Sequence, residues 1–261
     1  MYVEYLELSH QSDHIAGDLF RHLRAGAESG WDFSSRWFRD GRSLSSIHTT
    51  DIAAVDLNCL LLNLERTIAE AYQVARNVQE NQRFEEIVAR REAAIQKYFW
   101  SEEKGYYFDY DIARDQQTNA MTLAGAFPLF FKVATEGQAK AVAHTIEKKL
   151  LMPGGVVTTL ETTGQQWDAP NGWAPLQWIT IVGLENYGYH QLAAEIASRW
   201  IHLNSDVFKR TGKLMEKYNV VDTHLEAGGG EYPGQDGFGW TNGVLLALKA
   251  RGCVDGGSFR Q

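Results

Sequence analysis

Three segments of the sequence combine carboxylates with tryptophans and glycines. They span residues 28–37, 166–173 and 228–242, and one further acid lies shortly before the third segment. The acids concerned are Glu28, Asp32, Asp168, Glu216, Glu231 and Asp236. Hydrolysis of a glycosidic bond needs two carboxyl groups, one to protonate the departing oxygen and one to activate water or attack directly. Because tryptophan also offers a flat apolar face for a sugar ring, the three segments together favour a glycoside hydrolase.

Other chemistries lack their characteristic residues. The sequence contains no GxSxG nucleophile elbow, no glycine-rich phosphate loop followed by Lys-Ser or Lys-Thr, and no HExxH zinc motif. The histidines show no ligand spacing, and Cys59 and Cys253 stand apart, so we expect no metal and no cofactor. Cys59 lies in an apolar run and is predicted to be buried. For any single aspartate before a helix, the alternative to catalysis is a structural role as an N-cap.

Charge and hydropathy argue against several classes of partner. The formal net charge is −8 and no run of five or more basic residues occurs, so we expect no nucleic acid and no membrane partner. No stretch approaches the roughly 18 apolar residues of a membrane-spanning helix. The first residues lack the basic and apolar regions of a signal peptide. We therefore expect a cytoplasmic location, or a periplasmic or secreted one if a preceding part of the protein carries a signal.

The elements that must position these acids are predicted to be amphipathic helices. Apolar residues recur at helical spacing over 14–26, 51–78, 84–99, 118–135, 136–151, 175–187, 190–208 and 238–251. Asp51 is the expected N-cap of the second helix. Short strands are predicted over 106–109 and 156–159. Helices in pairs, joined by the glycine- and tryptophan-rich segments, are typical of an all-α toroid in which these loops meet around a central pocket. We expect one domain over residues 1–261, with 255–261 as a frayed tail.

The three segments also resemble the motifs of a known family. Gln166-Trp-Asp-Ala-Pro-Asn-Gly-Trp-Ala-Pro175 resembles the trehalase signature QWDxPxGWAP. Residues 28–37 look like the segment of that family that carries its general acid, and residues 228–243 look like its glycine-rich C-terminal motif. The motifs stand in the family's order, and the resemblance covers nearly the whole chain. Resemblance to trehalases, glycoside hydrolase family 37, implies an (α/α)6 barrel, no metal, and hydrolysis of α,α-trehalose to two glucose molecules with inversion.

The resemblance also implies a role for individual residues. It makes Asp32 the general acid and Glu216 the general base that activates water. Glu216 would pass for an ordinary helix-end or turn residue from its local sequence, so its assignment depends on the resemblance. Further positions implied to contact the substrate or to form the pocket wall are Gly30, Glu231, Trp167, Asn171 and Trp173.

Two departures from the family pattern affect the interpretation. The family's first signature, which resembles PGGRFxExYxWD, is absent, and so are the arginine-bearing segments that precede the general acid. About eight helices are predicted, whereas a closed (α/α)6 barrel has twelve. We therefore expect an incomplete toroid that lacks its N-terminal part, as a fragment or as one half of a two-chain enzyme. The alternatives are an inactive or sugar-binding trehalase-like fragment and another α/α-toroid glycosidase that acts on a different glucoside.

Overall fold

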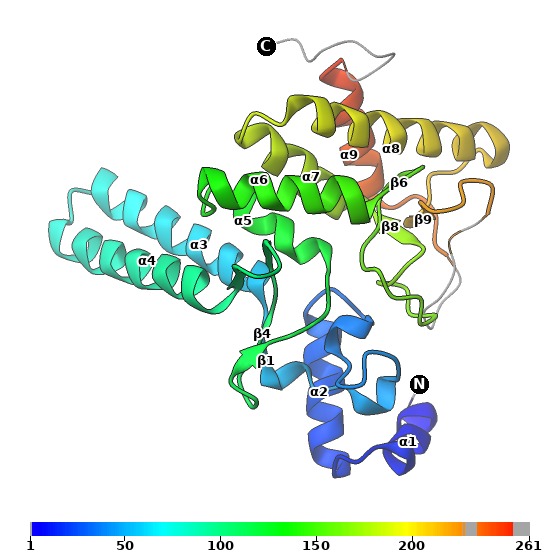
Figure 1. Cartoon of the computed structure of the whole chain (residues 1–261), viewed down its shortest axis with the longest axis horizontal. Helices are drawn as coiled ribbons and strands as arrows, with labels where there is room; N and C mark the ends of the chain where they lie inside the picture. Colours follow the sequence, from blue (N-terminus) through cyan, green and yellow to red (C-terminus); the bar gives the residue numbers. More distant parts are fainter. Residues whose placement is uncertain (1, 226, 228–233, 253–261) are drawn as a thin grey trace.

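The computed structural model describes residues 2–225, 227 and 234–252 (Figure 1). The predicted tail at 255–261 and the predicted substrate-binding residue Glu231 lie outside the described residues. The described part is mostly helical. Its α-helices are α1 (Tyr2–Gln11), α2 (Ala16–Glu28), α3 (Val55–Val74), α4 (Val78–Tyr98), α5 (Phe127–Phe130), α6 (Glu136–Thr145), α7 (Ala174–Asn186), α8 (His190–Thr211) and α9 (Gly239–Ala250).

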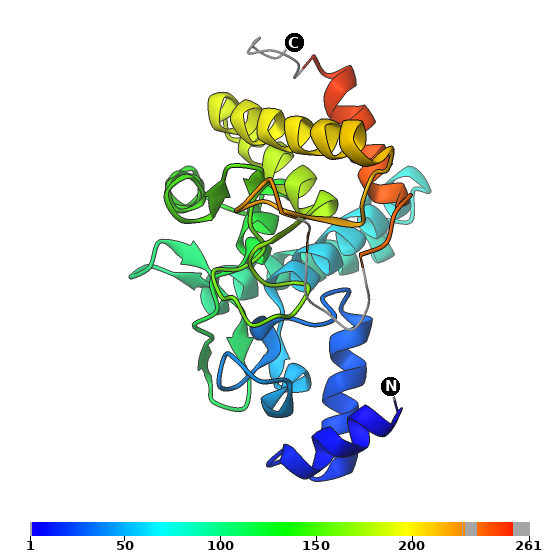
Figure 2. The same cartoon turned by 90° about the vertical axis from the view of Figure 1, so that its right-hand side faces the viewer.

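Helix α7 lies at the centre of the helical layers. It packs against α5, α8 and α9, while α3 and α4 pack against each other as a hairpin (Figure 1). Residues on nearly every side of α7 are buried, from Ala174 to Leu184. In both views α8 and α9 lie at one end of the molecule and α1 and α2 at the other (Figures 1 and 2). The segment that follows α2 and the segment that precedes α7 therefore meet between these two ends.

Short strands brace the loops between the helices. They are β1 (Ile52–Ala53), β2 (Trp100–Ser101), β3 (Tyr106–Tyr107), β4 (Tyr110–Asp111), β5 (Gln116–Gln117), β6 (Leu151–Met152), β7 (Gly155–Val156), β8 (Asn171–Trp173) and β9 (Lys217–Asn219). The β8–β9 pair is antiparallel, with Trp173 opposite Lys217. This register brings residues 166–173, called the QWD segment below, against the residues that directly follow Glu216.

Most predicted helices are confirmed, with different ends, but the one over 118–135 is wrong. Only Leu123–Ala126, as a 3-10 turn, and α5 are helical there. Thr122 bridges Thr159 instead, and the Leu123 N–H donates to the carbonyl of Thr158. These partners lie more than thirty residues away, so helical spacing within the segment did not reveal them. Helix α1 was not predicted, and the end of the predicted helix 136–151 is a π-helical turn.

The prediction that Asp51 caps a helix is also wrong. Strand β1 separates this residue from α3, which begins at Val55, and Asp51 instead pairs with Arg39 at 2.9 Å. The N–H of Val55 donates to the Oδ1 of Asp109 at 2.9 Å. A carboxylate at a helix N-terminus binds unpaired amides and interacts favourably with the helix dipole. The cap of α3 is thus supplied from a loop 54 residues further along the chain.

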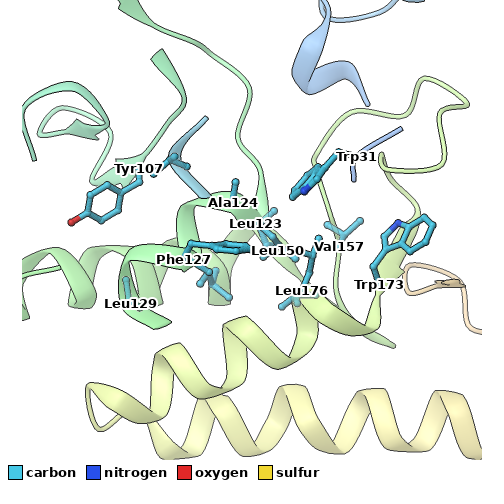
Figure 3. Packing of buried hydrophobic residues seen from close by; sticks show 14 of the residues in the cluster. Trp31, Tyr107, Leu123, Ala124, Phe127, Leu129, Leu150, Val157, Trp173 and Leu176 are labelled. Atoms are coloured by element: carbon cyan, nitrogen blue, oxygen red, sulfur yellow. The ribbon is translucent and has the colours of Figure 1, made fainter. Parts of the chain in front are cut away.

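One hydrophobic cluster connects the helices with the tryptophan-rich loops. Figure 3 shows Trp31 and Trp173 packed beside Leu123, Val157 and Leu176. Cys59 is fully buried, as predicted. Tryptophans that belong to sequence motifs therefore also contribute to the core. The assignment of residues 1–261 to a single domain stays a prediction.

Candidate active site

Four tryptophans bring the three motif segments together. The rings of Trp31 and Trp167 stack with centroids 5.3 Å apart, and those of Trp167 and Trp173 stack at 3.9 Å with an interplanar angle of 1°. The ring of Trp240 meets Trp173 edge-on at 5.9 Å. The first three are buried and Trp240 is half-buried. The predicted clustering of the three loops is confirmed for the described residues.

Asp32 lies in the turn that follows α2, and hydrogen bonds from the QWD segment fix the backbone of this turn. Gly30 has a φ of 80°, a conformation that favours glycine, and turns the chain after the helix. The side-chain amide of Gln166 donates to the carbonyl of Asp32, and the Trp167 N–H donates to the carbonyl of Phe33 at 3.1 Å. Asp32 itself is half-buried between two core residues. A segment 134 residues away in sequence therefore fixes the position of this acid.

The surroundings of Asp32 favour the protonated form. Burial raises the pKa of the Asp32 carboxyl above its ordinary value, and the negative charge of Glu216 adds to the rise. A hydrogen bond from its own backbone, the indole N–H of Trp167 and the positive charge of Lys217 partly offset it. The indole nitrogen of Trp167 is buried and forms no hydrogen bond of ordinary geometry with the described residues. A general acid needs such a raised pKa to hold its proton near neutral pH.

Glu216 directly precedes β9 and lies close enough to Asp32 to act on it electrostatically. Its N–H donates to the carbonyl of Gln235 at 2.8 Å, and its carbonyl accepts from Trp240 Nε1 at 3.3 Å. Its carboxylate accepts a hydrogen bond from Lys217 Nζ at 3.1 Å. The side chain keeps 15% of its surface exposed. Glu216 and Asp32 interact electrostatically, although 184 residues separate them in the numbering. The two acids implied by the family resemblance are brought together.

Asp168, a third candidate acid, has a structural role. It is fully buried and accepts hydrogen bonds from the Ser35 N–H at 2.9 Å and from several hydroxyl groups. These hydroxyls belong to Ser34, Ser35, Thr159 and Thr163. The carboxylate is thus saturated with donors and ties the segment after Asp32 to the QWD segment. This is the structural outcome that the sequence left open for an isolated aspartate.

The remaining predicted site residues form the support of the tryptophan stack. Asn171 Nδ2 and Trp173 Nε1 both donate to the carbonyl of Gln166, at 3.0 Å each. Asn171 and Trp173 are almost completely buried, and Trp167 is 5% exposed. In the described part of the chain these three residues position the loop. Their direct contact with a sugar, like that of Gly30, stays a prediction.

Sequence reasoning missed two residues of this cluster, Gln166 and Lys217. Both contact the backbone or side chain of a predicted catalytic acid. Gln166 opens the QWD motif and Lys217 directly follows Glu216, so both stood in segments already singled out. Their residue types alone do not indicate catalysis. Among the residues that the structure covers, no three potential metal ligands lie together, and no helix is long and apolar enough to cross a membrane.

Comparison with known proteins identifies the family to which the chain is similar. The family described as Trehalase matches residues 2–251. Periplasmic trehalases from Salmonella agona and Pseudomonas aeruginosa are 46% and 48% identical over 233 residues, which is 89% of this chain. The chain spans only 41% and 43% of their respective lengths. Their names give no support to the cytoplasmic location expected from the sequence.

Solved structures agree with the sequence comparison. The neutral trehalase of Saccharomyces cerevisiae matches with a TM-score of 0.75 and 27% identity, over 92% of this chain and 43% of that one. A GH63 mannosylglycerate hydrolase from Thermus thermophilus matches with a TM-score of 0.61 at 23% identity, over 76% of this chain and 44% of that one. The second likeness concerns the fold alone. The mostly helical fold therefore matches part of each of these chains. With the family match over almost its full length, the chain belongs to the trehalase family.

Proposed function

We propose that this chain carries the acid and the base of an inverting α,α-trehalase. The observation that supports the proposal is the contrast between two neighbouring carboxyl groups. Burial raises the pKa of Asp32, whereas Glu216 is hydrogen-bonded to an ammonium group and remains partly open to solvent. Two titratable groups in such different surroundings are the arrangement that acid–base catalysis requires.

The proposed reaction is a single displacement. Protonated Asp32 donates its proton to the oxygen that bridges the two glucose units. Ionised Glu216 takes a proton from a water molecule, whose oxygen attacks the anomeric carbon as the carbon–oxygen bond breaks. Inverting enzymes hold the two carboxyl groups roughly 6.5–9.5 Å apart to leave space for this water. One glucose leaves with inverted configuration and the other keeps its original one. Gly30, Trp167, Asn171, Trp173 and Glu231 are proposed to form or support the sugar-binding wall.

The span of the chain bears directly on activity. Because it covers less than half the length of the relatives named above, we propose that further residues complete the toroid. They would come from another part of the same protein or from a second chain. The names of the bacterial relatives favour the periplasm. The alternative is a sugar-binding fragment without turnover, which the same partial coverage would also produce.

Amide substitutions test the proposed roles in the complete protein. Asp32→Asn and Glu216→Gln preserve side-chain shape, so folding should survive while proton transfer fails. Each is expected to lower trehalose turnover by roughly 10²–10⁴-fold, which is the usual contribution of a general acid or base. Asp222→Asn is the matched control, since this exposed acid lies only six residues from Glu216 and should leave turnover unchanged.

Three results separate the proposal from its alternative. NMR of the first products should show one glucose of each anomeric configuration. Full activity of Asp32→Asn, or two products of the same configuration, would contradict the mechanism. If the chain alone changes its tryptophan fluorescence with trehalose but never hydrolyses it, the sugar-binding fragment is the better description.

A further inference from the structure

Lys217 is a buried lysine at the centre of the motif cluster. Only 2% of its surface is exposed, and lysines are rarely buried to that extent unless they are paired. Its Nζ lies 3.1 Å from Glu216 Oε2, 3.1 Å from Gln166 Oε1 and 5.3 Å from the centre of the Trp173 ring. Two hydrogen bonds and one aromatic face thus accommodate the three N–H groups of the ammonium.

A continuous series of hydrogen bonds links this lysine to both proposed catalytic acids. Lys217 donates to the amide oxygen of Gln166, and the amide nitrogen of Gln166 donates to the carbonyl of Asp32. The same ammonium group also donates to the carboxylate of Glu216. Gln166 is almost fully buried as well. The backbone that carries the acid and the carboxylate of the base are therefore connected through two side chains.

We infer that Lys217, oriented by Gln166, is a positioning residue that holds the base at a fixed place relative to the acid and supplies a positive charge that acts on both. The inference rests on the proposed function, because it assigns Asp32 and Glu216 their roles. A buried point charge suits this role, because it binds the carboxylate strongly while the ammonium also faces the ring of Trp173.

The charge of Lys217 acts on both acids. The titratable groups that the described residues place against it are Glu216, from the preceding position, and Asp32, from the loop after α2. Its positive charge lowers the pKa of Asp32, against the effects of burial and of Glu216. Removal of the charge should therefore make the Asp32 carboxyl harder to ionise. The general acid would then keep its proton to higher pH.

The test measures kcat/KM for trehalose against pH in the complete protein. For Lys217→Met we expect a loss of about 10- to 100-fold in kcat with little change in KM, and a shift of the alkaline limb of the pH profile to higher pH. Lys217→Arg keeps the charge and should keep this limb in place. Gln166→Met should lower kcat without moving the limb, and its effect should be smaller when Lys217 is already absent. Lys209→Met removes an exposed lysine on α8 as the matched control and should change nothing.

A second measurement does not depend on catalysis. The carboxyl signal of Asp32 in the ¹³C-aspartate-labelled protein can be assigned by its loss in Asp32→Asn. Titration of this signal should move to higher pH in Lys217→Met, whether or not trehalose is hydrolysed. If neither the alkaline limb nor the signal moves while stability to urea falls, Lys217 is only structural and the inference is wrong. An inactive wild-type protein in which the signal does move would overturn the proposed function but not the effect of the lysine charge on Asp32.

Discussion

Replacement of Arg36 by methionine should destabilise the protein more than any other single loss of charge in the motif segments. Its guanidinium is completely buried and forms two bidentate pairs, with nitrogen–oxygen distances of 2.7 Å to both oxygens of Asp56 and of 2.7 and 2.9 Å to those of Asp109. Its Cζ lies 4.5 Å from the ring centre of Trp31 and 4.4 Å from that of Trp37. Burial alone would lower the pKa of Arg36, but the two carboxylates raise it above its ordinary value.

The expected size of the effect follows from what methionine leaves behind. Removal of one partner of a buried ion pair costs about 3–5 kcal/mol, because the other charge stays buried without compensation. Here two carboxylates are left, although Asp109 keeps the Val55 N–H and Asp56 keeps the Leu57 N–H. We therefore expect a loss of about 4 kcal/mol in the free energy of unfolding. Against a typical total of about 5–15 kcal/mol, this is a large fraction.

Urea unfolding followed by tryptophan fluorescence measures this loss. With a slope of about 2–3 kcal/mol per M, the midpoint of Arg36→Met should fall by about 1–2 M. Arg36→Lys keeps the charge but cannot form two bidentate pairs, so we expect an intermediate loss in the free energy of unfolding. Arg39→Met is the control three residues away, and its exposed pair with Asp51 should contribute less than about 1 kcal/mol. If Arg36→Met and Arg39→Met unfold at the same urea concentration, the reasoning about buried charge is wrong.

Three further perturbations should have effects of known direction. Asp168→Ala leaves the buried Ser35 N–H without its acceptor and should cost about 3 kcal/mol in urea unfolding, and an unchanged midpoint would contradict this. Burial lowers the pKa of His48 to about 4 from 6.5. On acidification the unfolded chain therefore takes up a proton at this histidine at a higher pH than the folded chain does, and the free energy of unfolding should fall as pH drops from 6.5 to about 4. His48→Gln should flatten this dependence when unfolding is compared at several pH values in that range. Leu60 lies midway along an exposed leucine stripe of α3, so the chain alone should associate in light scattering and Leu60→Glu should reduce this; a monodisperse wild-type chain would contradict it.

Local patterns predicted the longer helices because their apolar spacing repeats over several turns. Helices α7, α8 and α9 coincide with predicted ranges to within three residues, and α4 begins six residues before its predicted start at 84. Their ends depend on single residues and were less accurate. For example, α8 extends past Phe208 to Thr211, because the residue that ends it is Gly212 with a φ of 72°. The motif segments were equally visible, since tryptophans and carboxylates in glycine-rich loops are uncommon.

Contacts between distant segments could not be predicted in the same way. The cap of α3 comes from Asp109, and the acceptor that holds Ser35 is Asp168, 133 residues away. Nothing near Lys217 in sequence shows that its ammonium also binds Gln166 and acts on Asp32. In each case the deciding partner lies on another element, so only the folded chain reveals the role. The resemblance supplied Glu216 for the same reason, because the family pattern records a spatial relation that local sequence does not contain.

The hydrogen bonds of the described acids support the proposed assignment of proton transfer to Asp32 and Glu216. A carboxylate offers about four acceptor sites. Asp168 uses its sites on serine and threonine donors, and Asp109 uses its sites on Arg36 and the start of α3. Such saturated groups can fix loops but have little capacity left for a water or a sugar oxygen. Glu216 accepts one hydrogen bond, from Lys217, among the described residues, and Asp32 is held chiefly through its backbone. The saturated acids Asp168 and Asp109 thus fix the loops in place. Asp32 and Glu216 are held at defined positions by these loops, and their carboxyl groups keep acceptor sites that the described residues do not fill.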